Sequence, residues 1–301
     1  MFHIIVNPIA GRGKTLQSLP LLTKLFDRNG VKYTTHITTC VADGYEKAKH
    51  LCKNASGIIG IGGDGTFQEI ATGMVDAFSE ENGGQRKIPV PLGIFPGGSG
   101  NDFIMTLAGS PGFEAANFFE IIKRGKTRTV DAITVNGMVY LNIGNVGLDA
   151  RIVRNAAVLK QKYGRQAYLA AVYKSIARHK NLPLKIEVNG QVLDKPYTLV
   201  AVCNGQYYGG GMRIAPGAKL DDGKITLCLI EGMSRAKTMV LFPSLMFAKH
   251  VKLKPVKFVE CENVAIILPS GEETLCLDGN LYPCRGRLEF KVLPGILDVF
   301  V

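Results

Sequence analysis

Short apolar runs alternate with longer segments of helical periodicity along the first 130 residues. The runs at 2–6, 33–38, 57–61 and 91–95 predict β-strands. The segments at 15–29, 42–54 and 66–78 predict helices, and the first of them repeats apolar residues at Leu16, Leu19, Leu22 and Leu25. Strands that alternate with helices indicate a parallel sheet with helices on its faces.

After residue 130 the pattern changes to short β-type runs separated by turns. The runs lie at 134–139, 184–188, 198–202, 224–230, 263–268, 274–277 and 288–292. Asn136-Gly137 and Asn189-Gly190 are hairpin signals, and helical segments at about 150–179 and 235–248 interrupt the runs. We therefore expect an α/β domain over 1–129 and an all-β domain, sandwich or barrel, over 130–292. A last strand at 293–301 could return to the first domain, and a cleft would separate the two.

Three loops of the first domain are rich in glycine and polar residues. They follow the first, third and fourth strands, at 7–13, 62–66 and 96–102. Ligands of parallel sheets lie beyond the carboxyl ends of the strands, so all three loops should share one edge. Glycine lets the backbone approach a ligand, and a helix N-terminus offers N–H donors to phosphate. One such turn could equally be an ordinary tight turn, but three together predict a phosphate site.

Carboxylates follow the same strands and suit a hard metal ion. Asp64, Asp102 and Asp131 come after the third strand, the fourth strand and the Thr129-Val130 run. Mg²⁺ prefers oxygen ligands and bridges substrate phosphates, as phosphoryl transfer requires. The chain has neither the G-x-x-x-x-G-K-[ST] motif nor the H-R-D and D-F-G motifs. P-loop enzymes and protein kinases are therefore excluded.

The composition narrows the class of protein and its compartment. Lys and Arg outnumber Asp and Glu by 36 to 25, for a net charge of +11, which favours an anionic partner. No aromatic–basic recognition motif accompanies this charge, so we expect no nucleic-acid binding. Seven scattered cysteines form no C-x-x-C pair, and no charged region precedes the first strand. No apolar run is long enough to span a bilayer. We expect a cytoplasmic protein in a reducing environment.

The ordered loops resemble the diacylglycerol kinase catalytic family, which includes bacterial lipid kinases and the sphingosine and ceramide kinases. The resemblance rests on Asn7-Pro8 with Gly11, on Gly62-Gly63-Asp64-Gly65-Thr66 and on the Pro-Gly-Gly-Ser-Gly-Asn-Asp run at 96–102. It continues through Val130-Asp131 and the segments 142–150 and 218–225. It implies an N-terminal three-layer α/β domain, similar to those of phosphofructokinase and NAD kinase, and a C-terminal β-sandwich domain.

The resemblance also implies the residues that hold ATP and Mg²⁺. Asp64 and Asp102 would organise Mg²⁺ and the γ-phosphate, and Asp131 would order this network near the acceptor hydroxyl. ATP would contact residues of the three loops and one after the second strand: Asn7, Pro8, Ala10, Gly11, Thr38, Gly62, Gly63, Gly65, Thr66, Glu69, Gly98, Ser99 and Asn101.

A second, structural Mg²⁺ site is implied in the β domain. Bacterial members build it from two backbone carbonyls around one Asp, and the matching positions are Lys219, Asp222 and Lys224. Taken alone, Asp222-Gly223 could equally be a plain hairpin turn.

The chain departs from the family near its C-terminus. The family has Asp-Gly-Glu, whose Glu is taken as the base for the lipid hydroxyl, whereas this chain has Asp278-Gly279-Asn280. A neutral amide is not a useful base near pH 7. Asp64 could carry the base role while Asn280 positions nucleotide or metal. Alternatively, the protein is a weakened kinase or a nucleotide- or lipid-binding relative, or the chain carries a changed residue.

We therefore expect an ATP-dependent lipid kinase, most simply one that converts diacylglycerol to phosphatidic acid. An NAD kinase-like small-molecule kinase is the alternative, and the loops at 7–11 and 96–102 argue against it. The substrate implies peripheral association with the anionic inner membrane surface, and a homodimer is a family-level expectation.

The basic stretch 150–180 has two interpretations. It is either a solvated helix face or a membrane-facing surface that carries Tyr163, Tyr168, Leu169 and Tyr173. In the second case, four lysines could extend it: Lys249, Lys252, Lys254 and Lys257.

Overall fold

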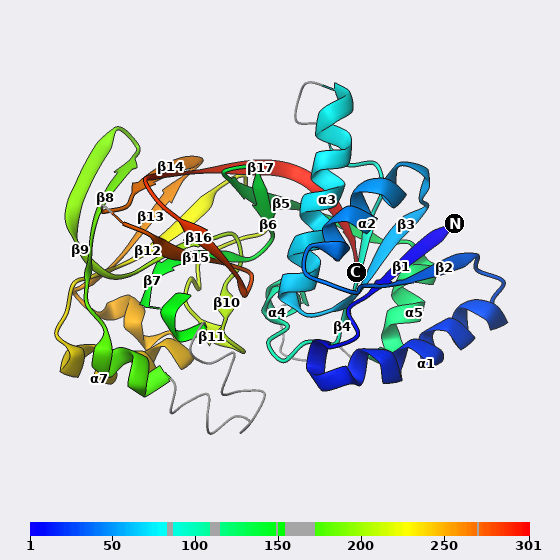
Figure 1. Ribbon diagram of the computed structural model, residues 1–301, viewed down its shortest axis with the longest axis horizontal. Coiled ribbons are helices and arrows are strands. Elements are labelled where there is room, and N and C mark those ends of the chain that lie inside the picture. The colour runs from blue at the N-terminus through cyan, green and yellow to red at the C-terminus, as the bar shows by residue number, and fades with distance from the viewer. Residues whose placement is uncertain (83–86, 109–114, 149, 154–171, 270) are drawn as a thin grey trace.

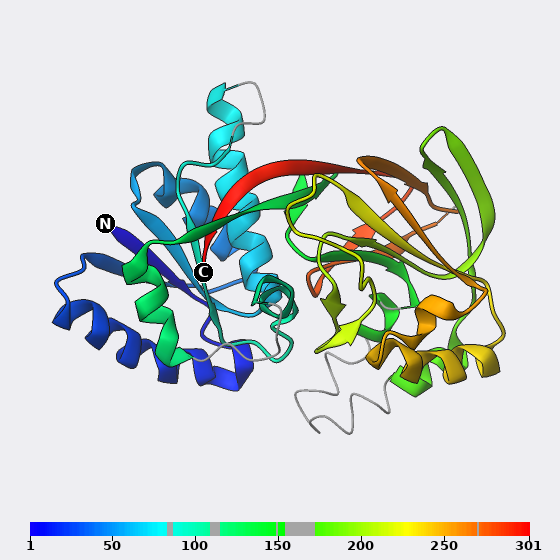
Figure 2. The ribbon, with the colours of Figure 1, turned by 180° about the vertical axis from the view of Figure 1, so that it is seen from behind.

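The computed structural model describes the chain except for residues 83–86, 109–114, 149, 154–171 and 270. The described residues form an N-terminal α/β domain and a C-terminal β-sandwich domain, which lie side by side (Figures 1 and 2). Tyr163, Tyr168 and Leu169 of the basic stretch lie outside the described residues. No described helix is long and apolar enough to cross a bilayer.

The α/β domain is built on parallel strands in the order β4-β3-β1-β2. The strands are β1 (Phe2–Val6), β2 (Tyr33–Ile37), β3 (Gly57–Gly62) and β4 (Leu92–Pro96). The helices are α1 (Lys14–Arg28), α2 (Asp43–Leu51), α3 (Asp64–Asn82), α4 (Asp102–Ala108) and α5 (Ala115–Arg124). The predicted parallel sheet is therefore confirmed, with element ends that differ by a few residues.

Helices cover both faces of this sheet, because side chains alternate along each strand. In β1, Ile4 joins the buried cluster that contains Phe26 of α1, whereas Ile5 joins the cluster that contains Phe67 of α3. Helices α1 and α5 lie on one face, and α2 and α3 on the other (Figure 1). Burial on both faces explains the near-continuous apolar runs in the sequence.

The described part of the C-terminal domain has thirteen strands, of which β10 and β11 form a separate two-stranded sheet, and the two Asn-Gly hairpins are confirmed. The strands are β5 (Thr127–Val135), β6 (Met138–Tyr140), β7 (Ile143–Gly147), β8 (Leu182–Val188), β9 (Gln191–Cys203), β10 (Tyr207–Tyr208), β11 (Met212–Arg213), β12 (Ile225–Glu231), β13 (Val256–Cys261), β14 (Asn263–Ile267), β15 (Glu273–Leu277), β16 (Asn280–Cys284) and β17 (Arg287–Phe300). Asn136 and Gly137 have φ of 49° and 82°, and Asn189 and Gly190 have 49° and 73°. Positive φ at both central residues is what a type I′ turn requires.

One sheet layer of the sandwich is buried on both sides. Val200 and Val202 of β9 face the sandwich interior, whereas Leu199 and Ala201 belong to a cluster that includes helix α7 (Arg235–Met246). Helical residues 172–178 pack into the same cluster through Val172 and Ile176.

Strand β17 joins the two domains. It pairs with β5 from Phe290↔Val135 to Phe300↔Thr127, with a shift in register between Leu293 and Leu297. Near its end, Val299 pairs with Leu92 of β4. The long red strand in Figure 1 thus runs from the sandwich into the α/β sheet.

Candidate active site

The loops after β1, β3 and β4 lie against one another. The N–H of Gly97 donates to the carbonyl oxygen of Gly62 at 2.7 Å, and the Asn7 amide donates to Thr66 Oγ1 at 3.0 Å. Gly11 has φ of 56°, and a Cβ on it would lie 2.0 Å from the carbonyl oxygen of Gly97. The structure therefore brings the three predicted loops together at one edge of the sheet.

The third loop is held by its own asparagine and packs closely on the second loop. Asn101, at φ of 57°, accepts from the N–H of Gly98 at 3.0 Å and donates to its carbonyl oxygen at 3.2 Å. A Cβ on Gly98 would lie 2.5 Å from the Cα of Gly63. The glycines of these two loops therefore expose a surface of backbone atoms, and Ser99 lies next to Gly98 in the same loop.

Asp64 links the starts of two helices. Its carboxylate accepts from the N–H of Asp102 at 3.1 Å and of Phe103 at 2.9 Å. The side chain keeps some exposure, yet desolvation by the surrounding protein atoms raises its pKa, and the two N–H groups oppose this rise. Asp64 is therefore better suited to accept a proton than an ordinary Asp.

Asp102 connects the loops to the β-sandwich. Its buried carboxylate accepts from the N–H groups of Gly210, at 3.0 Å, and Gly211, at 2.8 Å, between β10 and β11. The Asp64 and Asp102 carboxylates lie 3.1 and 2.9 Å from the point that a Cβ on Gly100 would occupy. The glycine thus leaves a space flanked by two carboxylates.

Oxygen donors in this space fit Mg²⁺. The ion prefers carboxylate oxygens and keeps waters or phosphate oxygens as further ligands. Within the described ranges, no cluster of three His, Cys, Asp or Glu residues could hold a metal. An ion between Asp64 and Asp102 would therefore need water or phosphate ligands, which matches a nucleotide-bound Mg²⁺.

Asn280 reaches the first turn of α3 from the sandwich. The Asp278-Gly279 turn, with φ of 46° and 93°, joins β15 to β16. The Asn280 amide donates to the carbonyl oxygen of Gly65 at 2.9 Å and to Gln68 Oε1 at 2.8 Å. Its oxygen lies 2.6 Å from the point that a Cβ on Gly65 would occupy.

Gln68 and Tyr282 complete this contact, and sequence reasoning missed both. The Tyr282 hydroxyl donates to Gln68 Oε1 at 2.9 Å, and the Gln68 amide donates to the carbonyl oxygen of Val139 at 2.8 Å. Gln68 is one helical turn beyond Asp64 on α3, and this spacing was the available signal. Position 280 thus faces two hydrogen-bond acceptors, and the side-chain amide of Asn280 donates to both.

Asp278 is a buried carboxylate that the sequence suggested only as part of a motif. It accepts from the N–H groups of Leu141, Asn142 and Ile143 at 2.8 to 3.1 Å. Burial, with a smaller effect of the Asp64 charge, raises the pKa of Asp278 to about 7, although the N–H groups favour its anion.

Glu69 lies near the start of α2, and Thr38 lies near the end of β1. The Glu69 carboxylate accepts from the N–H of Ala42 at 3.2 Å, and burial raises its pKa. The N–H of Thr38 donates to the carbonyl oxygen of Val6 at 2.9 Å. Pro8 and Ala10 lie in the loop after β1. Contact of these residues with ATP stays a prediction.

Asp131 lies where β5 and β17 cross between the domains. Its carboxylate accepts from the N–H groups of Gly223 and Gly295, each at 2.7 Å, and burial raises its pKa. These bonds hold the two connecting strands to the turn at 221–224. A role near the acceptor hydroxyl stays a prediction.

Asp222 and Lys224, two of the three residues predicted for the structural metal site, lie in that turn. Asp222 Oδ1 accepts from the N–H of Lys224 at 3.1 Å, as in the plain turn that the sequence allowed. Asp222 also lines a hollow of about 420 Å³ with Glu262, Asn263 and Lys291. The oxygen donors fit Mg²⁺, whereas the ammonium group of Lys291 opposes it. The carbonyls of Lys219 and Lys224 as ligands stay a prediction.

Two family models together match nearly the whole chain. Residues 1–135 match the diacylglycerol kinase catalytic domain, and residues 142–301 match the YegS C-terminal NAD kinase beta sandwich-like domain. The chain is 26% identical over 279 residues to the diacylglycerol kinase of Bacillus subtilis (strain 168), covering 92% of this chain and 88% of the relative. It is 24% identical to the diacylglycerol kinase of Mycobacterium tuberculosis (strain H37Rv), with coverage of 98% and 93%.

Solved structures show the same architecture. A crystal structure of a proposed diacylglycerol kinase from Bacillus anthracis superposes with a TM-score of 0.76 at 25% identity, covering 99% of this chain and 96% of the other. A second structure from the same organism gives a TM-score of 0.73 at 26% identity, with the same coverage.

Proposed function

The chain belongs to the bacterial diacylglycerol kinase catalytic-domain family and is a lipid kinase, and from this premise we propose that it transfers the γ-phosphate of ATP to the free hydroxyl of diacylglycerol. The products would be phosphatidic acid and ADP. The reaction would take place at the inner membrane surface, where the protein would associate peripherally.

The observation that supports this proposal best is the meeting of three glycine-rich loops beside two carboxylates. Gly11, Gly97 and the start of α3 leave backbone surface for a polyphosphate. Asp64 and Asp102 flank the space at Gly100. Asn7, Thr66 and Ser99 add polar groups at the same edge.

Asp64 and Asp102 would hold a nucleotide-bound Mg²⁺, which supplies charge neutralisation for the phosphates. Phosphoryl transfer depends mainly on positioning and electrostatics, so these residues would act by positioning the γ-phosphate for attack by the hydroxyl. The bonds from Asp102 to Gly210 and Gly211 would fix the sandwich, and with it the lipid, against the nucleotide loops.

The transfer forms one bond and breaks another. The lipid oxygen attacks the γ-phosphorus, the bond to the bridging oxygen breaks, and ADP leaves. The hydroxyl proton would move to a carboxylate oxygen, and we assign this role to Asp64, which lies beside the space at Gly100. Asn280 would position Gly65 and Gln68 instead. A loose transition state asks little of a base, so transfer is compatible with an amide at position 280.

The test is label transfer from [γ-³²P]ATP to a panel of acceptors. Vesicles with diacylglycerol, ceramide or sphingosine, and NAD in solution, would be compared with and without Mg²⁺. We expect Mg²⁺-dependent labelling of diacylglycerol above the other acceptors. Labelling of NAD alone would support the small-molecule alternative, and intact ATP binding with no labelled acceptor would support a binding protein without kinase activity.

A further inference from the structure

An unusual surface lies on the β-sandwich domain, at α7 and the 3₁₀ helix η3 (Lys249–Lys252) that follows it. Residues 235–258 contain six Lys or Arg residues and neither Asp nor Glu. Large apolar side chains are exposed among them: Val240 by 79%, Met246 by 42%, Phe247 by 74%, Val251 by 39% and Leu253 by 39%. We call these five residues, with Lys237, Lys249, Lys252 and Lys254, the apolar–lysine surface.

Helix α7 carries apolar side chains on both its buried and its exposed side. Leu241, Phe242 and Leu245 face the core of the domain and are buried. A helix with one buried face normally carries polar residues on the other. Val240 and Phe247 instead extend into water, where they gain nothing for folding. The exposed side of α7 therefore has the composition of a contact surface.

The lysines of this surface lack acidic partners among the described residues. Arg235 donates to the carbonyl oxygen of His179, and Lys257 forms an ion pair with Glu231 at 3.1 Å. Within the described ranges, no ion pair with Asp or Glu involves Lys237, Lys249, Lys252 or Lys254. The Lys249 ammonium lies 5.9 Å from the ring centre of Phe247, so charge and apolar surface are contiguous.

The described end of the basic helical stretch adjoins α7. The bond from Arg235 of α7 to His179, which directly follows the helical residues 172–178, links the two segments, and Ile176 shares a cluster with Leu241. Tyr173 is 43% exposed, and the nearby Lys174 and Arg178 are also exposed. Exposed basic and apolar side chains are therefore also present on the helical residues 172–178 beside α7.

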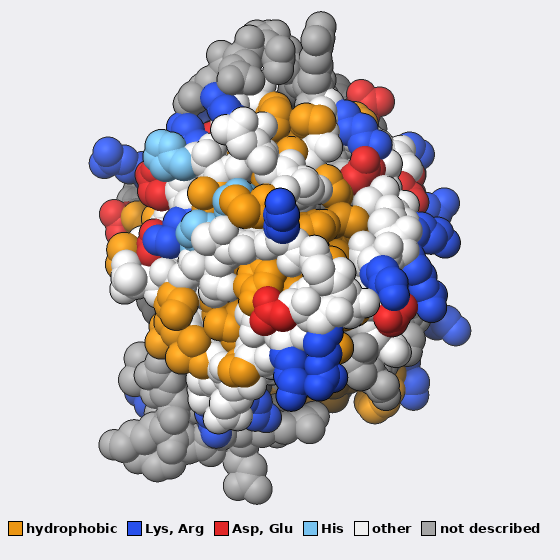
Figure 3. Space-filling model, turned by 90° about the vertical axis from the view of Figure 1, so that its right-hand side faces the viewer, with side chains coloured by type: hydrophobic (Ala, Val, Ile, Leu, Met, Phe, Trp, Pro, Cys, Tyr) orange, Lys and Arg blue, Asp and Glu red, His pale blue; other side chains and the backbone are white. Residues whose placement is uncertain are grey.

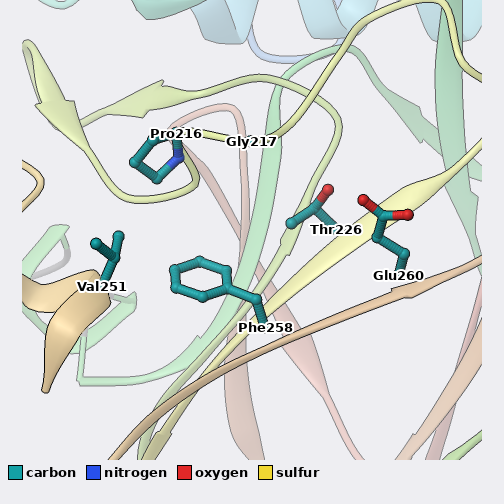
Figure 4. A pocket seen from close by; sticks show the side chains of 6 residues that line it. All are labelled: Pro216, Gly217, Thr226, Val251, Phe258 and Glu260. Atoms are coloured by element: carbon teal, nitrogen blue, oxygen red, sulfur yellow. The ribbon is translucent and has the colours of Figure 1, made fainter.

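An apolar hollow borders the surface on its other side. Val251 and Phe258 line a cavity of about 440 Å³ together with Pro216, while Thr226 and Glu260 form its polar part (Figure 4). The cavity extends the apolar area from η3 toward β13.

Other exposed apolar side chains lie on the α/β domain. Met1, Leu21 and Ile37 are exposed on the α/β domain. Figure 3 views that end of the molecule and shows acidic and basic side chains interspersed among the apolar ones. At α7 and η3 the exposed apolar side chains lie in a segment, 235–258, that has basic residues and neither Asp nor Glu.

We propose that the apolar–lysine surface docks on an anionic lipid bilayer. Val240, Phe247 and their apolar neighbours would enter the boundary between headgroups and acyl chains, and the lysines would contact lipid phosphates. A second copy of the chain fits less well, because it would bring the same lysines together. The choice of a bilayer rests on the proposed function, since a lipid kinase must reach a substrate held in a membrane.

The test is co-sedimentation with vesicles of phosphatidylglycerol and phosphatidylcholine, and with phosphatidylcholine alone. We expect binding to the anionic vesicles that weakens with salt. The double variant V240D/F247D should bind at least about tenfold more weakly, because two apolar anchors are lost. Replacing Lys249, Lys252 and Lys254 by Gln should weaken binding to anionic vesicles only. The control is V192D, which changes an apolar residue, 57% exposed, on β9 of the same domain.

Phosphorylation of a water-soluble short-chain diacylglycerol separates this proposal from the proposed function. The surface variants should retain that activity and the melting temperature of the wild type. If the wild type phosphorylates no lipid, yet its vesicle binding depends on Val240 and Phe247, the docking surface stands and the kinase function fails. Variant binding equal to that of the wild type would overturn the docking proposal. So would a wild-type dimer, by light scattering, that V240D/F247D converts to monomers without changing vesicle binding.

Discussion

At the scale of single residues, Asn280 is the main departure from the family, and its surroundings match an amide. The carbonyl oxygen of Gly65 and Gln68 Oε1 are both acceptors, and each receives a hydrogen bond from the Asn280 nitrogen. Gln68 cannot reverse its amide without losing the bond to Val139. A carboxylate at position 280 would thus face two acceptors.

We therefore predict that Asn280→Glu lowers stability and leaves turnover unimproved. Loss of two bonds at a half-buried site should cost about 1–3 kcal/mol of unfolding free energy. Asn280→Gln, which keeps the donor, is the control. The measurements are denaturant unfolding and lipid phosphorylation. A rise in turnover of about two orders of magnitude, the size of a general-base contribution, would show that position 280 is the site of the base.

From the raised pKa of Asp278 we predict that the free energy of unfolding depends on pH. Its pKa is near the ordinary Asp value in the unfolded chain and about 7 in the folded protein. Between about pH 4 and pH 7 the folded protein therefore holds a proton that the unfolded chain has released, so the free energy of unfolding should fall as pH rises through this range.

Thermal melts at pH 5 and pH 8 measure this effect. The wild type should melt at a higher temperature at pH 5, and Asp278→Asn, which cannot ionise, should reduce the difference. The variant should also be less stable at both pH values, because its NH₂ group meets backbone N–H donors. A pH difference that the substitution leaves unchanged would assign the effect to other groups.

The sequence indicated Asp64 and Asp102 because each follows an apolar strand in a glycine-rich loop. It could not indicate that Asn280 and Tyr282 both bond to Gln68, because Gln68 lies more than 200 positions from each of them in the chain. Such pairs depend on how the domains meet, and local patterns carry no information about that.

At the scale of elements, the loop after β1 must approach the loop after β4, and Gly11 permits this. A Cβ on Gly11 would clash with the carbonyl oxygen of Gly97. Gly30 has a similar positive φ of 66°, but no atom lies within 4 Å of its Cβ position. A substitution at Gly11 therefore disturbs both the loop contact and the backbone conformation, whereas one at Gly30 disturbs only the backbone conformation.

We predict that Gly11→Ala weakens ATP binding at least about tenfold, since the displaced loop would no longer fit the phosphates. Gly30→Ala should cost about 1 kcal/mol of stability and leave ATP affinity unchanged. Calorimetric titration with ATP and Mg²⁺ measures both. Equal ATP affinity in Gly11→Ala and the wild type would remove this loop from the nucleotide site.

Strands, helices and the two type I′ hairpins could be predicted from local pattern, since apolar period and Asn-Gly turns act over a few residues. The order of the strands could not. Strand β17 pairs with β14, β5 and β4, and Gly295, within its register shift, donates its N–H to Asp131. Such long-range pairing is fixed by packing of the complete sheet.

At the scale of the whole molecule, a shared sheet and a few polar contacts hold the nucleotide loops against the sandwich. β5 and β17 cross between the domains, Asp102 bonds to the turn after β10, and Asn280 bonds to the start of α3. This arrangement places a phosphate site of one domain beside the turns of the other. We propose that phosphoryl transfer takes place at this junction and depends on Asp64.

The most direct measurement is Mg²⁺-dependent transfer of ³²P from ATP to diacylglycerol in anionic vesicles, by the wild type and by Asp64→Asn. We expect transfer by the wild type and a loss of at least about a hundredfold in the variant, with the variant still folded by circular dichroism. Equal rates for the two proteins, or no transfer by a folded wild type that binds ATP, would contradict this proposal.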